Sequence, residues 1–131
     1  MQRRDFFMVG AVTAVGGVSR VFAQRGGEMY GLISKITAAP DKRDELISIL
    51  LEGVAAMPGC LSYIVAKDTS DANAIWITEA WDNKASHDAS LSLPSVKEAI
   101  AKGRPLIAGF SDRVVTTPVG GTGLALPDHP R

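Results

Sequence analysis

The stretch from Asn73 to His87, NAIWITEAWDNKASH, determines how the rest of the sequence is interpreted. Its first half, Ile75 to Thr78, consists of β-branched and aromatic residues, which fit the pleated surface of a strand. The strand is expected to end at Trp81. The turn residues Asp82-Asn83 then lead into a helix that begins near Lys84, with Asn83 as its cap.

Three chemically useful side chains gather at this strand-to-helix corner, namely Glu79, Trp81 and His87. Residues two apart on a strand point to the same face, so Glu79 and Trp81 share a side of the sheet. An unperturbed imidazole titrates near neutral pH, which suits proton transfer. We therefore expect any chemistry at this corner. The alternatives are a core tryptophan, a salt-bridging glutamate and a surface histidine.

Composition places the chain among small globular proteins. Its 131 residues allow one domain, and its 14 basic and 14 acidic side chains balance. That balance gives no indication of a nucleic acid or an anionic surface as partner. Cys60 is the single cysteine, so no internal disulfide can form; it is expected to be a small core residue at a strand start.

Residues 1–23 have the layout of an export signal. Arg3-Arg4-Asp5-Phe6-Phe7 precedes a Gly-rich apolar run, and Val21-Phe22-Ala23 supplies small residues for cleavage. The apolar run is shorter than the roughly 20 residues that span a bilayer. The paired arginines resemble the twin-arginine motif, which implies a periplasmic or secreted protein without a stable membrane anchor after cleavage.

The sequence before the central stretch predicts a strand, a helix and a second strand. A flexible lead over 24–28 precedes a strand over 29–37, and Asp41 is expected to cap the helix that follows. Gly53 is expected to let this helix approach the sheet closely. Pro58-Gly59 ends the helix, and the second strand covers 60–67. The helix carries an apolar stripe at helical spacing, formed by Leu46, Ile49, Leu50, Val54 and Met57.

The sequence after it predicts the remaining elements. The third strand, over 73–81, forms a hairpin with the second. A short helix over 84–91 ends at Leu93-Pro94, and a further helical segment covers 96–102. A connector at 105–109 leads to the last strand at 110–117. The Gly- and Pro-rich tail, 118–131, is expected either to be disordered or to wrap over a partner subunit.

The order β-α-β-β-α-β is the ferredoxin-like arrangement, an α+β fold with a four-stranded antiparallel sheet. Helices would cover one face of this sheet. The other face is also largely apolar, because Trp76, Thr78 and Ala80 alternate with Ile75 and Ile77. Exposing a large apolar face to water is unfavourable, so we expect a homodimer in which two such sheets pack against each other.

Four features, in order and at matching spacing, resemble the antibiotic biosynthesis monooxygenase (ABM) family over residues 29–117. They are Pro40-Asp41-Lys42-Arg43-Asp44-Glu45, Met57-Pro58-Gly59-Cys60-Leu61, Glu79-Ala80-Trp81 and Leu93-Pro94-Ser95-Val96. The resemblance implies a dimeric α/β barrel. It also implies a monooxygenase that needs no metal or flavin and oxidises a small quinol or phenol with O₂. The alternatives are a non-catalytic module that binds a small aromatic ligand, a stress-related protein of the same fold, and an isomerase.

The resemblance also assigns expected roles to individual residues. Trp81 would position the substrate, by stacking and through its N–H group, and His87 would move the proton. Many quinol-type members carry a histidine where this chain has Ser90, which shares a helix face with His87. The other expected substrate-binding residues are Glu79, Tyr63, Ser90 and Lys97. Haem is not expected, because Ile100 stands where haem-degrading relatives carry a histidine ligand.

Overall fold

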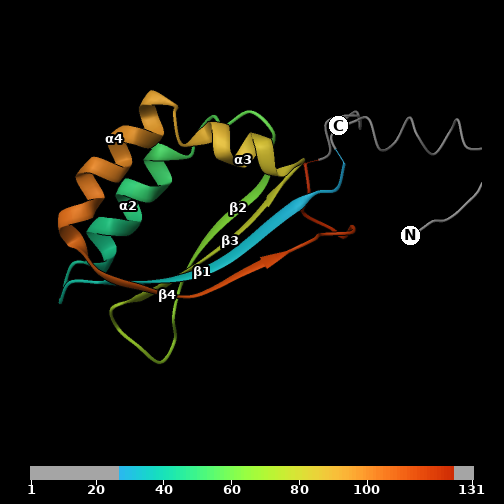
Figure 1. Cartoon of the computed structure of the whole chain (residues 1–131). Helices are drawn as coiled ribbons and strands as arrows, with labels where there is room; N and C mark the ends of the chain where they lie inside the picture. Colours follow the sequence, from blue (N-terminus) through green and yellow to red (C-terminus); the bar gives the residue numbers. More distant parts are fainter. Residues whose placement is uncertain (1–26, 126–131) are drawn as a thin grey trace, which may run out of the picture.

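The computed structural model describes residues 27–125, so the expected export signal and the last residues of the tail lie outside the described part. Within that range the elements follow the order β-α-β-β-α-α-β, with one 3₁₀ turn, η1 (Arg104–Leu106), before the last strand (Figure 1). The strands are β1 (Tyr30–Ala38), β2 (Cys60–Lys67), β3 (Ala74–Trp81) and β4 (Ile107–Thr116). The helices are α2 (Arg43–Gly53), α3 (Lys84–Ser90) and α4 (Pro94–Gly103).

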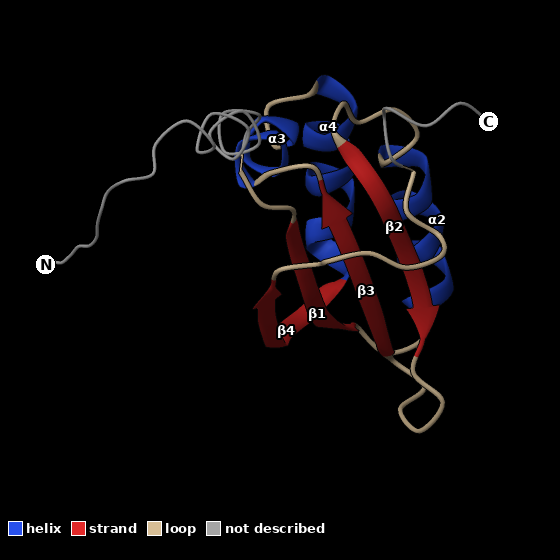
Figure 2. Ribbon diagram, turned by 90° about the vertical axis from the view of Figure 1, so that its right-hand side faces the viewer, coloured by secondary structure: helices blue, strands red, loops and turns tan. Residues whose placement is uncertain are grey.

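The strands form one antiparallel sheet in the order β2-β3-β1-β4. All three helices lie on the same face of this sheet, and the other face is free of helices (Figures 1 and 2). The ferredoxin-like prediction is therefore confirmed. The short helix predicted over 84–91 and the helical segment predicted over 96–102 are present as α3 and α4, and α4 begins two residues earlier than predicted, with Pro94 in its first turn.

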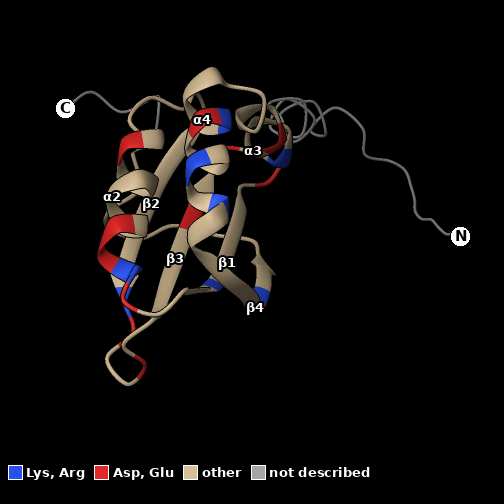
Figure 3. Cartoon of the chain, turned by 90° about the vertical axis from the view of Figure 1, so that its left-hand side faces the viewer, with Lys and Arg blue, Asp and Glu red and all other residues tan. Residues whose placement is uncertain are grey.

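The core lies between the sheet and the helices, and strand alternation decides which residues enter it. Ile36 on β1 faces Ile75 on β3, and Leu46 of α2 covers them with no exposed surface. A second cluster joins Tyr30, Leu32 and Trp81 near the start of α3. Charged residues occur along both α2 and α4 (Figure 3), and all of them except the partly buried Arg43 are exposed.

Helices α2 and α3 differ in how their N-termini are capped. Asn83 caps α3 as predicted, because its side-chain oxygen accepts a hydrogen bond from the Ser86 N–H at 2.8 Å. The prediction for Asp41 is wrong. Its φ of 67° is left-handed, and Lys42 stands at the cap position without a side-chain hydrogen bond. Asp41 therefore forms the turn before α2 rather than its cap.

Gly53 provides close packing, but between two helices rather than on the sheet as predicted. A Cβ atom added at Gly53 would lie 2.5 Å from the Cβ of Ala99 on α4. Real Cβ atoms do not approach so closely, so the missing side chain sets the spacing of α2 and α4. Because α2 and α4 cover one face of the sheet (Figure 1), the distance between them also determines the space between the helices and the sheet.

The last strand begins three residues earlier than the predicted Phe110. Ile107 and Gly109 pair with Ala38 and Thr37 of β1, and the segment 105–109 is therefore only partly a connector. Long-range pairing with β1 determines this start, and local composition does not reveal it. Among residues 27–125, no helix has the length and apolar character needed to cross a membrane.

The first part of the tail crosses the sheet face that carries no helices (Figure 2). Pro118 lies against Gly31 of β1, where an added Cβ would stand 3.0 Å from the proline ring. At the opposite edge, the Ala125 N–H donates to the carbonyl of Leu61 on β2 at 2.9 Å. The tail therefore spans from β4 to β2 over this face, as far as the described residues extend.

Candidate active site

A cavity of about 750 Å³ lies between the helices and the sheet. Most of its lining is apolar and comes from β1, α2, α4 and β4. Polar side chains enter it where β3 meets α3, at the corner that the sequence singled out. The sequence-predicted residues that line the cavity are Tyr63, Glu79, Trp81, His87 and Ser90.

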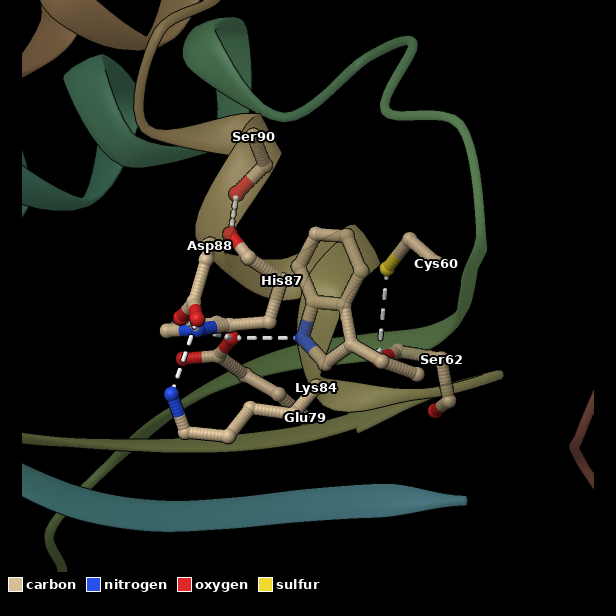
Figure 4. A network of polar contacts seen from close by, with 8 residues as sticks. Cys60, Ser62, Glu79, Lys84, His87, Asp88 and Ser90 are labelled. Carbon is tan, nitrogen blue, oxygen red and sulfur yellow. Dashed lines mark hydrogen bonds and ion pairs between the residues drawn. The ribbon is translucent and has the colours of Figure 1, made fainter. Parts of the chain in front are cut away.

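Trp81 is the largest buried side chain at this corner, with 1% of its surface exposed. Its indole Nε1 donates to Oε1 of Glu79 at 2.9 Å, a bond drawn as a dashed line to the labelled Glu79 in Figure 4. The two residues are two apart on β3 and therefore share a face of the sheet. The sequence led us to expect that the indole N–H contacts the substrate. In the structure this N–H is bonded to Glu79 instead. The ring itself lines the cavity.

Glu79 is a buried carboxylate whose side chain is 10% exposed. Burial raises the pKa of Glu79, and the hydrogen bond from Trp81 together with the nearby charges of His87 and Arg113 only partly offset the rise. A carboxyl with a raised pKa holds and releases its proton closer to neutral pH than an exposed one. Perturbed groups of this kind in cavities are candidates for acid–base chemistry.

The His87 ring packs edge-on against Trp81, with 5.5 Å between centroids, and lies 5.2 Å from the ring of Tyr30. Its side chain is 12% exposed, so the helix directs it inward. Its Nε2 atom stands 4.0 Å from Oε1 of Glu79. Thus the structure brings together all three residues of the predicted corner.

Asp88, which sequence reasoning missed, contacts the other nitrogen of this ring. Its Oδ1 lies 3.1 Å from Nδ1 of His87, and its Oδ2 accepts from the Lys84 ammonium at 2.8 Å. Hydrogen bonds from Lys84 and His87 hold the pKa of Asp88 below its usual value. An ionised carboxylate only accepts, so Nδ1 carries the proton, and in the neutral ring Nε2 offers its lone pair toward Glu79.

Ser90 supports the histidine through the backbone. Its hydroxyl donates to the carbonyl of His87 at 2.6 Å, and the residue is only 4% exposed. Tyr63 lies opposite Glu79 in the β2–β3 pairing. Burial raises the pKa of the Tyr63 phenol, and the charge of Glu79 adds to the rise. Tyr63 therefore enters the cavity as a neutral hydroxyl.

Lys97 is exposed and is not part of the cavity wall; its neighbour Val96 lines the cavity instead. Two arginines do line it, Arg104 from η1 and Arg113 from β4, and sequence reasoning had selected neither. Asp88 was identifiable from its position directly after His87. Arg113 was not, because its orientation depends on an irregularity of β4. Within residues 27–125, no three histidine, cysteine, aspartate or glutamate side chains gather as metal ligands.

The chain is similar to several solved structures. A crystal structure from Chloroflexus aurantiacus, described only provisionally as an antibiotic biosynthesis monooxygenase, is 62% identical; the match covers 73% of this chain and 98% of that one, with a TM-score of 0.72. A structure from Pseudomonas aeruginosa shares the fold at 23% identity, with a TM-score of 0.63 and coverages of 72% and 97%.

Sequence comparison also finds an uncharacterised protein of Synechocystis that is 32% identical over 76 residues. The match covers 56% of this chain, and the chain spans about half (52%) of that protein's length. The family model of antibiotic biosynthesis monooxygenases matches residues 29–102, which is more than half of the chain. The resemblance that rests on the Pro40, Met57, Glu79 and Leu93 segments is thus confirmed, and the chain belongs to the antibiotic biosynthesis monooxygenase family.

Proposed function

We propose that this protein is a cofactor-independent monooxygenase that oxidises a hydroquinone or phenol with O₂. The observation that carries the proposal is the corner of the cavity where Nε2 of His87 and the buried Glu79 carboxylate face the same apolar space, 4.0 Å apart. Such a cavity can exclude water from an electron-rich ring and place a proton acceptor beside it.

The reaction requires little from the protein beyond proton transfer. A hydroquinone that loses a proton becomes an anion able to reduce O₂ directly. The overall balance is one hydroquinone plus one O₂ giving one hydroxyquinone plus one water. In this proposal Nε2 of His87 accepts the phenolic proton, and Asp88 stabilises the imidazolium through Nδ1–H. The apolar walls strengthen these charge interactions by excluding solvent.

Glu79 has two roles in this proposal. Its Oε1 atom accepts the Trp81 N–H and thereby fixes the indole as a flat wall for the substrate ring. Its raised pKa also makes it able to exchange a proton with His87 during turnover. Tyr63, a neutral phenol on the neighbouring strand, is placed to donate a hydrogen bond to a substrate oxygen.

Oxygen uptake by the full chain with a panel of hydroquinones tests the proposal. Replacing His87 with alanine should lower kcat by about 10²- to 10⁴-fold, the usual contribution of a general base. Lys97→Ala is the matched control, because Lys97 does not line the cavity, and it should retain full uptake. Equal uptake by His87→Ala and the unaltered protein would place the chemistry elsewhere.

One observation favours a second function, a module that binds a small aromatic ligand without converting it. The N–H of Trp81 and the hydroxyl of Ser90 are both used within the chain, so fewer donors face a substrate than expected. Calorimetry separates the two functions. A hydroquinone that binds with heat release but gives no oxygen uptake under air supports the module and contradicts the oxygenase.

The assembly and address of the protein are part of the same proposal. A homodimer would bring the helix-free sheet faces together, with the tail residues that cross them as part of the interface; on this face Ile64 and Val114 are 56% and 50% exposed. Ile64→Lys should then yield monomers in light scattering, whereas Lys97→Ala should not change the mass.

Export follows from the twin-arginine resemblance: replacing Arg3 and Arg4 with lysine should retain the protein in the cytoplasm.

A further inference from the structure

The strand β4 carries a bulge beside the cavity. In the pairing with β1, Ile33 faces Val114 and Lys35 faces Ser111. One residue of β1 therefore lies opposite two residues of β4, Asp112 and Arg113. Asp112 takes the left-handed conformation, with φ of 52°, which aspartate tolerates better than most residues.

This bulge changes which charge faces the cavity. Phe110 pairs with Ile36, and Val115 pairs with Leu32, so both belong to the helix-covered face. Strict alternation from Phe110 would put the carboxylate of Asp112 on that face. Because of the extra residue, Arg113 lines the cavity and Asp112 does not. The irregularity thus replaces an anion with a cation in the cavity wall.

No carboxylate neutralises this cation by direct contact. Among residues 27–125, the guanidinium of Arg113 takes part in no hydrogen bond and no salt bridge. Arg113 and Glu79 interact only through their charges: burial raises the pKa of Glu79, and Arg113 is among the charges that oppose this rise. Arg113 therefore keeps donors for a ligand.

We infer that Arg113 binds an ionised carboxylate on the substrate, so that the substrate class is an aromatic hydroquinone or phenol bearing an acid group. The inference rests on the proposed function for the phenol part of the ligand. A guanidinium offers two parallel N–H groups that match a carboxylate, and such charged pairs are stronger than neutral hydrogen bonds. The apolar walls around Leu32 and Phe110 take the ring.

The test compares two ligands that differ in one charge, gentisate and its methyl ester. Their dissociation constants with the full chain are measured by calorimetry under nitrogen, so that no turnover is needed. The unaltered protein should bind gentisate about tenfold more tightly than the ester, the expected size of one charge-assisted contact. Arg113→Gln should abolish this preference and leave the ester's dissociation constant unchanged.

Two further variants keep the result specific. Asp112→Asn removes a neighbouring charge but suits the same left-handed backbone, and it should retain the tenfold preference. Arg104→Gln removes the other arginine of the cavity wall. Loss of the preference in Arg104→Gln but not in Arg113→Gln overturns the inference, as does equal binding of acid and ester by the unaltered protein. Tighter binding of the acid, combined with no oxygen uptake when the same ligand is tested under air, supports the role of Arg113. That outcome contradicts only the proposed oxygenase activity.

Discussion

The molecule contains two tryptophan–carboxylate pairs at opposite ends of β3, and their proton affinities move in opposite directions. Trp76 donates to Asp68 at 2.7 Å, and Trp81 donates to Glu79 at 2.9 Å. The pKa of Asp68 falls to about 2, whereas the pKa of Glu79 rises. Nearly identical hydrogen bonds are thus compatible with opposite behaviour.

The surroundings explain the difference. Asp68 lies in the turn after β2; besides the hydrogen bond from Trp76, it accepts two backbone N–H groups, from Ser70 and Asp71, which favour the ionised form. Glu79 has one such donor and is buried against the cavity, so desolvation outweighs the bond. The first pair therefore fastens a turn, whereas the second keeps a carboxyl available for proton transfer.

The largest expected effect is on stability, from truncating the two indoles. Trp81→Ala should lower the free energy of unfolding by about 3–5 kcal/mol, the usual cost of removing a fully buried aromatic ring. Trp76→Ala should cost about 1 kcal/mol, because that ring is only partly buried. Urea unfolding measures both. Equal costs would contradict the distinction between a buried site and a surface turn.

Arg43 provides the next largest effect, at the end of the sheet that holds Asp68. Its Nη1 atom lies 3.2, 3.0 and 3.3 Å from the carbonyl oxygens of Asp68, Asp71 and Ala74. Arg43→Ala should lower the free energy of unfolding by about 1–3 kcal/mol, because charged hydrogen bonds to partly buried carbonyls are lost. Oxygen uptake should not change, and a loss of uptake in a folded variant would show that the two ends of the sheet are coupled.

At the other end, Asp88→Asn should mainly affect catalysis. The amide keeps the shape of the carboxylate but no longer supplies the charge that stabilises a protonated His87. We expect kcat to fall roughly tenfold while KM stays constant, less than the 10²- to 10⁴-fold loss expected for the base itself, because Asp88 acts only through His87. Unfolding in urea should change little, since the Asp88 side chain is 52% exposed. A fall in stability equal to that of Trp81→Ala would assign Asp88 to structure.

The smallest expected effect is on how the free energy of unfolding depends on pH, where Glu79 and Asp68 contribute with opposite signs. Folded Glu79 holds its proton more tightly than the unfolded chain, so its contribution to stability is complete below pH 4.5 and is lost as the pH rises through the folded pKa. The contribution of Asp68 is complete above pH 3.8 and is lost as the pH falls toward 2. Unfolding curves between pH 2 and 8 should therefore show opposite changes of slope in Glu79→Gln and Asp68→Asn. Slopes that change in the same direction would refute the role of burial.

Much of the fold follows from local patterns in the sequence. Strand alternation and turn residues predict the order of elements, the hairpin of β2 and β3, and the cap at Asn83. The same alternation predicts that Glu79 and Trp81 share a face. The same stretch also contains His87, but its sequence left open whether the ring points inward or to the surface, and the structure places His87 in the cavity lining.

The remainder depends on contacts between distant segments. The start of β4 is set by pairing with β1, and the position of Gly53 is set by Ala99 on another helix. The bulge at Asp112 reverses the alternation of β4 at one point, and nothing in its composition reveals that reversal. The resemblance pointed to Lys97 as the basic residue of the site, whereas the basic residues in the cavity wall are Arg104 and Arg113.

The bulge also has a consequence for solubility. β4 is an edge strand of the sheet and carries the exposed apolar side chains Phe110, Val114 and Val115. A straight edge of this kind would recruit the same strand from another molecule and start aggregation. The extra residue interrupts the row of free backbone groups, and the two charged residues of the bulge, Asp112 and Arg113, make regular pairing costly. One irregular residue thus keeps a hydrophobic edge from acting as a template.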